Sequence, residues 1–169
     1  MSVLVAGIGN IFLTDDGFGC AVALGLAGSP LPDGVEVVDY GIRGMDLAYA
    51  MLDGLDAVVL LDAAPRGLRP GTLSVIEPGL DVEGRGFDAH GMDPVQVLAL
   101  ARSLGGPGHA LPRTLVVACE PQTVMTGEED EIVAALSEPV RAALDPAAAL
   151  VEELLDELTT RPEPEARTS

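Results

Sequence analysis

The stretch VLVAGIGNIFLTDDGFGCAVALGLAG, residues 3–28, combines the two patterns that decide the fold. Residues 3–9 form a continuous apolar and β-branched run that ends in glycines, which is typical of a strand buried on both faces. Residues 17–28 follow with apolar side chains at helical spacing. We therefore predict a strand, a tight turn and a helix, which together form the repeating unit of α/β proteins.

The rest of the chain continues this alternation. Further strands are expected at 35–41, 56–64 and 113–121, and helices at 45–54, 92–106 and 146–160. Residues 71–79 read as an edge or antiparallel strand, and the region that begins at 127–136 is expected to be helical. Strands that alternate with helices predict an α/β fold, in which helices cover both faces of a mostly parallel sheet.

Length and composition predict a single domain over residues 1–160. The chain has 169 residues, of which 48% are hydrophobic, so it can bury a substantial core. The polar, proline-rich end at 161–169 is expected to be disordered. No signal-peptide pattern is present, and no apolar run reaches the roughly 18 residues that span a bilayer. We expect a soluble, cytoplasmic protein, with a monomer as the simplest state.

The formal net charge of −18 restricts the class of partner. Nucleic acids and anionic membranes are bound chiefly through clusters of Lys and Arg, and a strongly acidic chain repels both. We therefore expect no nucleic acid and no membrane as partner. The acidity by itself identifies no other partner.

The chain has two cysteines and two histidines to offer for chemistry. Cys20 and Cys119 are far apart and form no CxxC pattern, so we interpret both as core thiols. His109 lies in a Gly/Pro loop and reads as a surface residue. His90 lies in a polar loop just before a predicted helix, where its side chain is free to reach a site.

Three aspartates are predicted to converge at one edge of the sheet. Asp16 follows the first strand, Asp39 lies near the end of the second, and Asp62 lies near the end of the third. The carboxyl ends of parallel strands share one edge, where open α/β sheets hold their ligands. The alternatives are structural: Asp15 or Asp16 as a helix N-cap, Asp39 as a turn residue, and Asp62 as a cap or turn residue.

The glycine-rich turn also allows a nucleotide-binding interpretation. The motif GIGNIFLTDDG begins like a dinucleotide loop, but Phe12 stands where the third glycine would be. Asp15 and Asp16 would face the phosphates at the helix N-terminus. Asp39, an acidic residue at the end of the second strand, keeps this alternative open.

A cation fits the same residues better. Two carboxylates, Asp16 and Asp62, together with the imidazole of His90 suit a divalent ion such as nickel or zinc. A set of three ligands also leaves coordination positions open for a substrate.

Four motifs, in this order, resemble the hydrogenase maturation endopeptidases: GIGNIFLTDDGFG, DYGIRG, LLDAAPRG and DAHGMDP. The resemblance covers residues 3 to 158. It implies a compact α/β/α sandwich around a five-stranded sheet. It also implies an activity, the removal of a C-terminal peptide from the precursor of a [NiFe] hydrogenase large subunit once nickel has been inserted.

The resemblance also implies roles for individual residues. Asp16, Asp62 and His90 would be the catalytic set that contacts nickel, with the metal supplied by the precursor. Within DYGIRG, the family's substrate-recognition segment would correspond to Asp39, Gly41 and Gly44. Tyr40 and Arg43 depart from the more glycine- and threonine-rich stretch that many members have there. A non-catalytic nickel-binding maturation chaperone is the remaining alternative.

Overall fold

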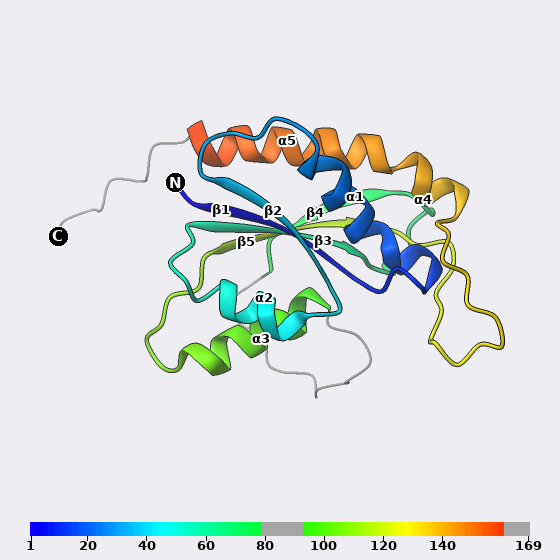
Figure 1. Ribbon diagram of the computed structural model, residues 1–169, viewed down its shortest axis with the longest axis horizontal. Coiled ribbons are helices and arrows are strands. Elements are labelled where there is room, and N and C mark those ends of the chain that lie inside the picture. Colours follow the sequence, from blue (N-terminus) through cyan, green and yellow to red (C-terminus); the bar gives the residue numbers. More distant parts are fainter. Residues whose placement is uncertain (79–92, 161–169) are drawn as a thin grey trace.

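The computed structural model describes residues 1–78 and 93–160, and Figure 1 shows the arrangement of its elements. The strands are β1 Val3–Ile8, β2 Val35–Gly41, β3 Ala57–Ala63, β4 Leu73–Ile76 and β5 Arg113–Cys119. The helices are α1 Phe18–Ala27, α2 Gly44–Ala50, α3 Pro94–Gly105, α4 Glu138–Ala142 and α5 Leu144–Thr160, and a short 3-10 helix, η1 Thr14–Gly17, precedes α1. The predicted disordered tail at 161–169 lies outside the described residues.

The five strands form one sheet in the order β2-β1-β3-β5-β4. β1 pairs in parallel with both β2 and β3, and β3 pairs in parallel with β5. β4 is an edge strand that runs antiparallel to β5. The predicted five-stranded, mostly parallel sheet is therefore confirmed, and so is the edge character of the fourth strand.

Helices cover both faces of the sheet (Figure 1). On one face, alternate strand residues such as Val5 and Val59 pack with apolar residues of α1, α4 and α5. On the other face, Ala6 and Leu60 pack with α2 and α3. β1 and β3 are buried along nearly their whole length because both of their faces are covered.

The two cysteines lie in the interior, as predicted. Cys20 and Cys119 are both free and buried. Burial is the main cause that raises the pKa of Cys20 to about 12 and that of Cys119 to about 11. Neither thiol is therefore a nucleophile at neutral pH.

No helix in the described part of the chain is long and apolar enough to cross a membrane.

The prediction of a helix beginning at 127–136 is wrong. Residues 121–137 form a long irregular segment between β5 and α4. Their backbone groups are bonded elsewhere: the carbonyl of Val133 accepts from the Thr14 N–H at 2.8 Å, and the N–H of Ser137 donates to Asp15 at 2.7 Å. Tertiary contacts with η1 replace the hydrogen bonds of a helix. The other predicted helices are present, although α2 ends at Ala50 rather than at Gly54.

Gly19 allows α1 to pack against the sheet at backbone distance. A Cβ atom built on Gly19 would overlap the carbonyl oxygen of Leu61 in β3 and would lie 2.6 Å from that of Ile8 in β1. A carbon atom cannot approach a carbonyl oxygen this closely. Both oxygens belong to the strand backbone, so neither can move aside as the end of a flexible side chain could. Because Gly19 has no side chain, helix α1 can pack this close to the sheet.

This contact predicts opposite effects for two glycine substitutions in α1. Gly19→Ala should lower the free energy of unfolding by about 1–3 kcal/mol because the new methyl group overpacks the helix–sheet contact. Gly25→Ala should raise it by about 0.5–1 kcal/mol, because the space around Gly25 is open and alanine favours the helix. Urea unfolding monitored by circular dichroism measures both. Equal effects for the two variants would contradict the close contact.

Candidate functional site

A tight turn after β1 presents the carboxylate of Asp16. Gly9 has φ +128°, and a Cβ atom on it would overlap the carbonyl oxygen of Asp16. The backbone N–H of Asn10 donates to Asp16 Oδ2 at 2.7 Å and orients the side chain. Burial raises the pKa of Asp16, and the bond from Asn10 offsets this only in part. The glycine-rich turn therefore serves to hold a partly desolvated carboxylate.

Asp62 lies at the carboxyl end of β3 and is only 6% exposed. Burial raises its pKa well above the ordinary range of an aspartate, and repulsion from Asp16 and then Asp93 raises it further. The adjacent N–H of Ala63 counteracts this weakly. The structure therefore brings Asp62 and Asp16 into electrostatic contact, as the strand topology predicts.

Comparison with two other buried carboxylates distinguishes Asp62. Glu120 accepts hydrogen bonds from the N–H groups of Arg66 at 2.7 Å and Gly67 at 3.2 Å. Asp15 accepts four hydrogen bonds from residues 122–137. Within residues 1–78 and 93–160, Asp62 receives support only from the neighbouring N–H of Ala63. A buried carboxylate with so few donors is costly unless a cation or a proton neutralises it.

A groove of about 410 Å³ opens beside Asp16 at the carboxyl edge of the sheet. Two parts of its lining were missed by the sequence analysis. Asp93 is the N-cap of α3, where it forms a capping box with Gln96, and it also lines the groove. The segment 121–126 forms a further wall, through Pro121 and Thr123–Thr126. Its position directly after β5 was the available signal, because every parallel strand delivers its following loop to this edge.

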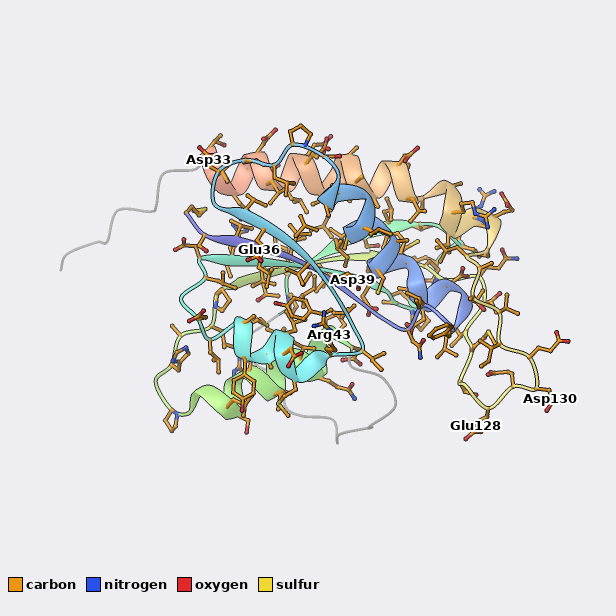
Figure 2. The ribbon with its side chains drawn as sticks, in the orientation of Figure 1. Asp33, Glu36, Asp39, Arg43, Glu128 and Asp130 are labelled. Atoms are coloured by element: carbon orange, nitrogen blue, oxygen red, sulfur yellow. The ribbon has the colours of Figure 1, made fainter. Side chains whose placement is uncertain are left out.

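Asp39 has the structural role that was considered for it. Its Oδ1 accepts the N–H of Gly41 at 3.0 Å, which organises the turn after β2. Arg43 donates to the carbonyl of Asp39 at 2.8 Å, and Figure 2 labels both residues at the end of β2. After burial, Asp39 and then Asp16 raise the pKa of the Cys20 thiol. The N–H of Gly9 donates to the carbonyl of Gly41 at 2.9 Å, so the DYGIRG turn contacts the turn that presents Asp16. Gly44 is buried at the start of α2.

The third predicted ligand, His90, lies outside the described residues. Within the described ranges, no three His, Cys, Asp or Glu side chains are arranged to hold a metal ion. Asp16 and Asp62 supply carboxylate oxygens, and the repulsion of the Asp62 charge by Asp16 and then by Asp93 would be relieved by a cation. The donor chemistry therefore fits a divalent ion completed by further ligands. His109 is exposed, as predicted.

Asp15 does not cap a helix, and neither does Asp16. Neither η1 nor α1 has a side-chain cap, since Leu13 and Gly17 occupy the N-cap positions. The N-cap interpretation of the DD pair is therefore wrong.

Burial raises the pKa of Asp15, but its hydrogen bonds from Ser137, Thr123 and Gln122 outweigh burial, so the pKa is lowered overall.

Fold and site together define an α/β protein with an acidic groove at the carboxyl edge of its sheet. The sequence pattern of the hydrogenase maturation protease family matches residues 22–154. The chain therefore belongs to the hydrogenase maturation proteases, and it is a peptidase.

Similarity to individual relatives and solved structures supports this family membership. The chain is 34% identical over 160 residues to the hydrogenase expression/formation protein HupM of Azotobacter chroococcum, which covers 92% of this chain and 72% of that protein. The structure of the hydrogenase maturating endopeptidase HybD from Escherichia coli superposes with a TM-score of 0.75 at 28% identity and covers 93% of both chains. The hydrogenase 2 maturation peptidase of a Thaumarchaeota archaeon gives a TM-score of 0.66 at 32% identity, over 92% of this chain and 98% of that one.

The same isosteric substitution should have opposite effects at two buried aspartates. Asp15→Asn should lower the free energy of unfolding by about 2–4 kcal/mol, because it removes a charge that satisfies several N–H donors. Asp62→Asn should raise it at pH 7–8, because it removes a desolvated charge that Asp16 repels. Since the pKa of Asp62 is raised on folding, its charge destabilises the fold at any pH above the ordinary aspartate pKa of about 4, so the gain should grow with pH.

Urea titrations of both variants at pH 5 and pH 8 measure these effects. Destabilisation by Asp62→Asn at pH 8 would show that its carboxylate is satisfied in the folded protein, contrary to the geometry.

Proposed function

We propose that this chain is a three-layer α/β/α endopeptidase that removes a C-terminal peptide from the nickel-loaded precursor of a [NiFe] hydrogenase large subunit. The observation that carries the proposal is the buried Asp62 carboxylate, whose pKa is raised by burial and by repulsion from Asp16 and then Asp93. Membership of the hydrogenase maturation proteases supports the reaction class. We further propose that the protein acts in the cytoplasm as a monomer.

Recognition in this proposal depends on a metal that belongs to the substrate. Nickel held by the precursor docks against Asp16, Asp62 and His90, and this positions the peptide bond in the groove. Burial and repulsion give the two carboxylates a strong preference for a cation. A precursor without nickel lacks the docking point, so it is left uncleaved.

The chemical step needs a base and an acid. A water molecule beside the groove attacks the carbonyl carbon of the peptide bond, and Asp62 accepts the proton from this water. The carbon–nitrogen bond then breaks, and the proton passes to the leaving amine. Burial of Asp62 at the carboxyl end of β3 places this carboxylate next to the groove, where a base of the reaction is needed.

Exposed apolar side chains around the groove support a protein as the substrate. They come from three of the four loops that follow the parallel strands at this edge: Ile11 and Phe12 after β1, Ile42 after β2, and Val124 and Ile132 after β5. Apolar surface of this kind marks protein contacts more often than sites for small polar ligands. The precursor partner fits this rim better than a nucleotide does, since Asp16, Asp62 and Asp93 would repel phosphate.

Substitution of Asp16 or of His90 should abolish processing of the precursor. Asp16→Asn and His90→Ala should each lower cleavage of the nickel-loaded precursor at least about 100-fold, because the metal loses a docking ligand. His109→Ala, at the other histidine, should leave it unchanged. Mass spectrometry of the precursor after incubation with each variant measures the shortening. A precursor prepared without nickel should stay full length. If the chain binds nickel tightly but never shortens the precursor, it is the chaperone rather than the protease.

The apolar rim predicts a difference between two equally exposed residues. Ile42 is 72% exposed on the rim, and Leu24 is 74% exposed on α1. Ile42→Ser should lower kcat/KM for the precursor roughly tenfold, because an apolar contact worth about 1–2 kcal/mol is lost. Leu24→Ser should have no effect on kcat/KM. Steady-state cleavage at several precursor concentrations provides the comparison, and equal values for the two variants would exclude the rim as the docking surface.

A further inference from the structure

Asp15 is a fully buried carboxylate that binds one distant segment through both of its oxygens. Its Oδ2 accepts the N–H groups of Gln122 and Thr123, each at 2.9 Å, and the hydroxyl of Ser137 at 2.9 Å. Its Oδ1 accepts the N–H of Ser137 at 2.7 Å. All four donors belong to residues 121–137, more than a hundred positions along the chain. Asp15 therefore joins both ends of this segment to η1.

Thr14 forms hydrogen bonds to the middle of the same segment, residues 121–137. Its N–H donates to the carbonyl of Val133 at 2.8 Å, and its hydroxyl donates to the sulfur of Met125 at 2.7 Å. Thr14 is also the one residue other than glycine with positive φ, at 49°, in the described part of the chain. A β-branched residue adopts this conformation only where its surroundings impose it. The pair Thr14 and Asp15 thus forms one clasp on residues 121–137.

The clasped segment has little else to hold it. It contains no helix or strand, and Val124, Ile132 and Val133 are exposed. Figure 2 shows Glu128 and Asp130 at its outer turn, away from the sheet. The buried residues of the two core clusters include no member of the segment, and only Leu136 packs against one of them. Its position therefore depends on the hydrogen bonds to Thr14 and Asp15 more than on apolar burial.

The same segment forms a wall of the groove that contains Asp16. Thr123, Val124 and Met125 line the groove on one side, and Asp16 is the direct neighbour of Asp15 in the chain. We propose that Asp15 is a positioning residue, which sets the distance between the groove wall at 121–126 and the Asp16 carboxylate and so determines how the peptide substrate is held. This inference rests on the proposed function, because it concerns the groove in which that function places the substrate.

Two variants weaken the clasp, and a third serves as a matched control. Asp15→Asn replaces the carboxylate, whereas Ser137→Ala removes only the hydroxyl bond and leaves the fold intact. Glu129→Gln is the control: Glu129 also accepts backbone N–H groups, from Thr126 and Gly127 at 2.8 Å, but these bonds stay within the segment. It does not connect the segment to η1.

The first measurement is hydrogen exchange of the amides of Gln122, Thr123 and Ser137 in the intact chain. Because a hydrogen bond to a charged group is stronger than one to a neutral group, Asp15→Asn should accelerate exchange roughly 10–100-fold at these amides. Ser137→Ala should give a smaller acceleration at the same sites, and Glu129→Gln should give none. Amides of β1 and β3 should keep their protection in all three variants. Unchanged exchange at Gln122 and Thr123 in a folded Asp15→Asn variant, or in Ser137→Ala should the former fail to fold, would overturn the clasp.

The second measurement is the steady-state cleavage of the nickel-loaded precursor. Because the clasp acts on binding geometry, we expect KM to rise roughly tenfold in Asp15→Asn while kcat changes less than about threefold. Ser137→Ala should show the same split in weaker form, and the control should match the unmodified chain. A loosened segment with unchanged KM would overturn the positioning role. If the unmodified chain does not cleave the precursor at all, the proposed function fails, whereas the exchange data still report on the clasp separately.

Discussion

The parallel pairing of β1 with β2 on one side and with β3 on the other is the constraint on which the site depends. Three chain segments that are far apart in sequence must then end at one edge of the sheet. Gly19 of α1 lets this helix approach the strands at backbone distance, against the carbonyl of Leu61. The turn between β1 and α1, which contains Gly9, leaves Asp16 at the edge. Fold and site are therefore consequences of one packing arrangement.

The buried acids of this edge show how stability and function are divided among similar residues. Asp15 and Glu120 are satisfied by backbone N–H groups and hold loops in place. In the described part of the chain Asp62 has only the N–H of the adjacent Ala63 as such a donor, and Asp16 and Asp93 repel its charge. A protein gains nothing for its folding from such a carboxylate. The proposed function supplies the reason for its presence, because a cation or a proton would neutralise its charge.

The segment 121–137 links these two kinds of carboxylate. It is irregular because its backbone N–H groups donate to the carboxylates of Asp15 and Glu129. In a helix they would donate to backbone carbonyls one turn earlier. Its residues 121 and 123–126 line the groove that contains Asp16, and its Ile132 and Val133 have exposed side chains. One element of tertiary structure thus supports the substrate groove and contributes to the apolar rim.

The sequence by itself determined the strands, most of the helices and the convergence of Asp16 and Asp62, because buried strands and helix caps are encoded by local patterns. The order of the strands, β2-β1-β3-β5-β4, was not part of the prediction. Only the tertiary structure decided that Asp15 binds residues 122–137 instead of capping α1, that 127–136 is not helical, and that Asp93 lines the groove. Each of these depends on hydrogen bonds or repulsions between residues that are distant in sequence, and no local pattern contains that information.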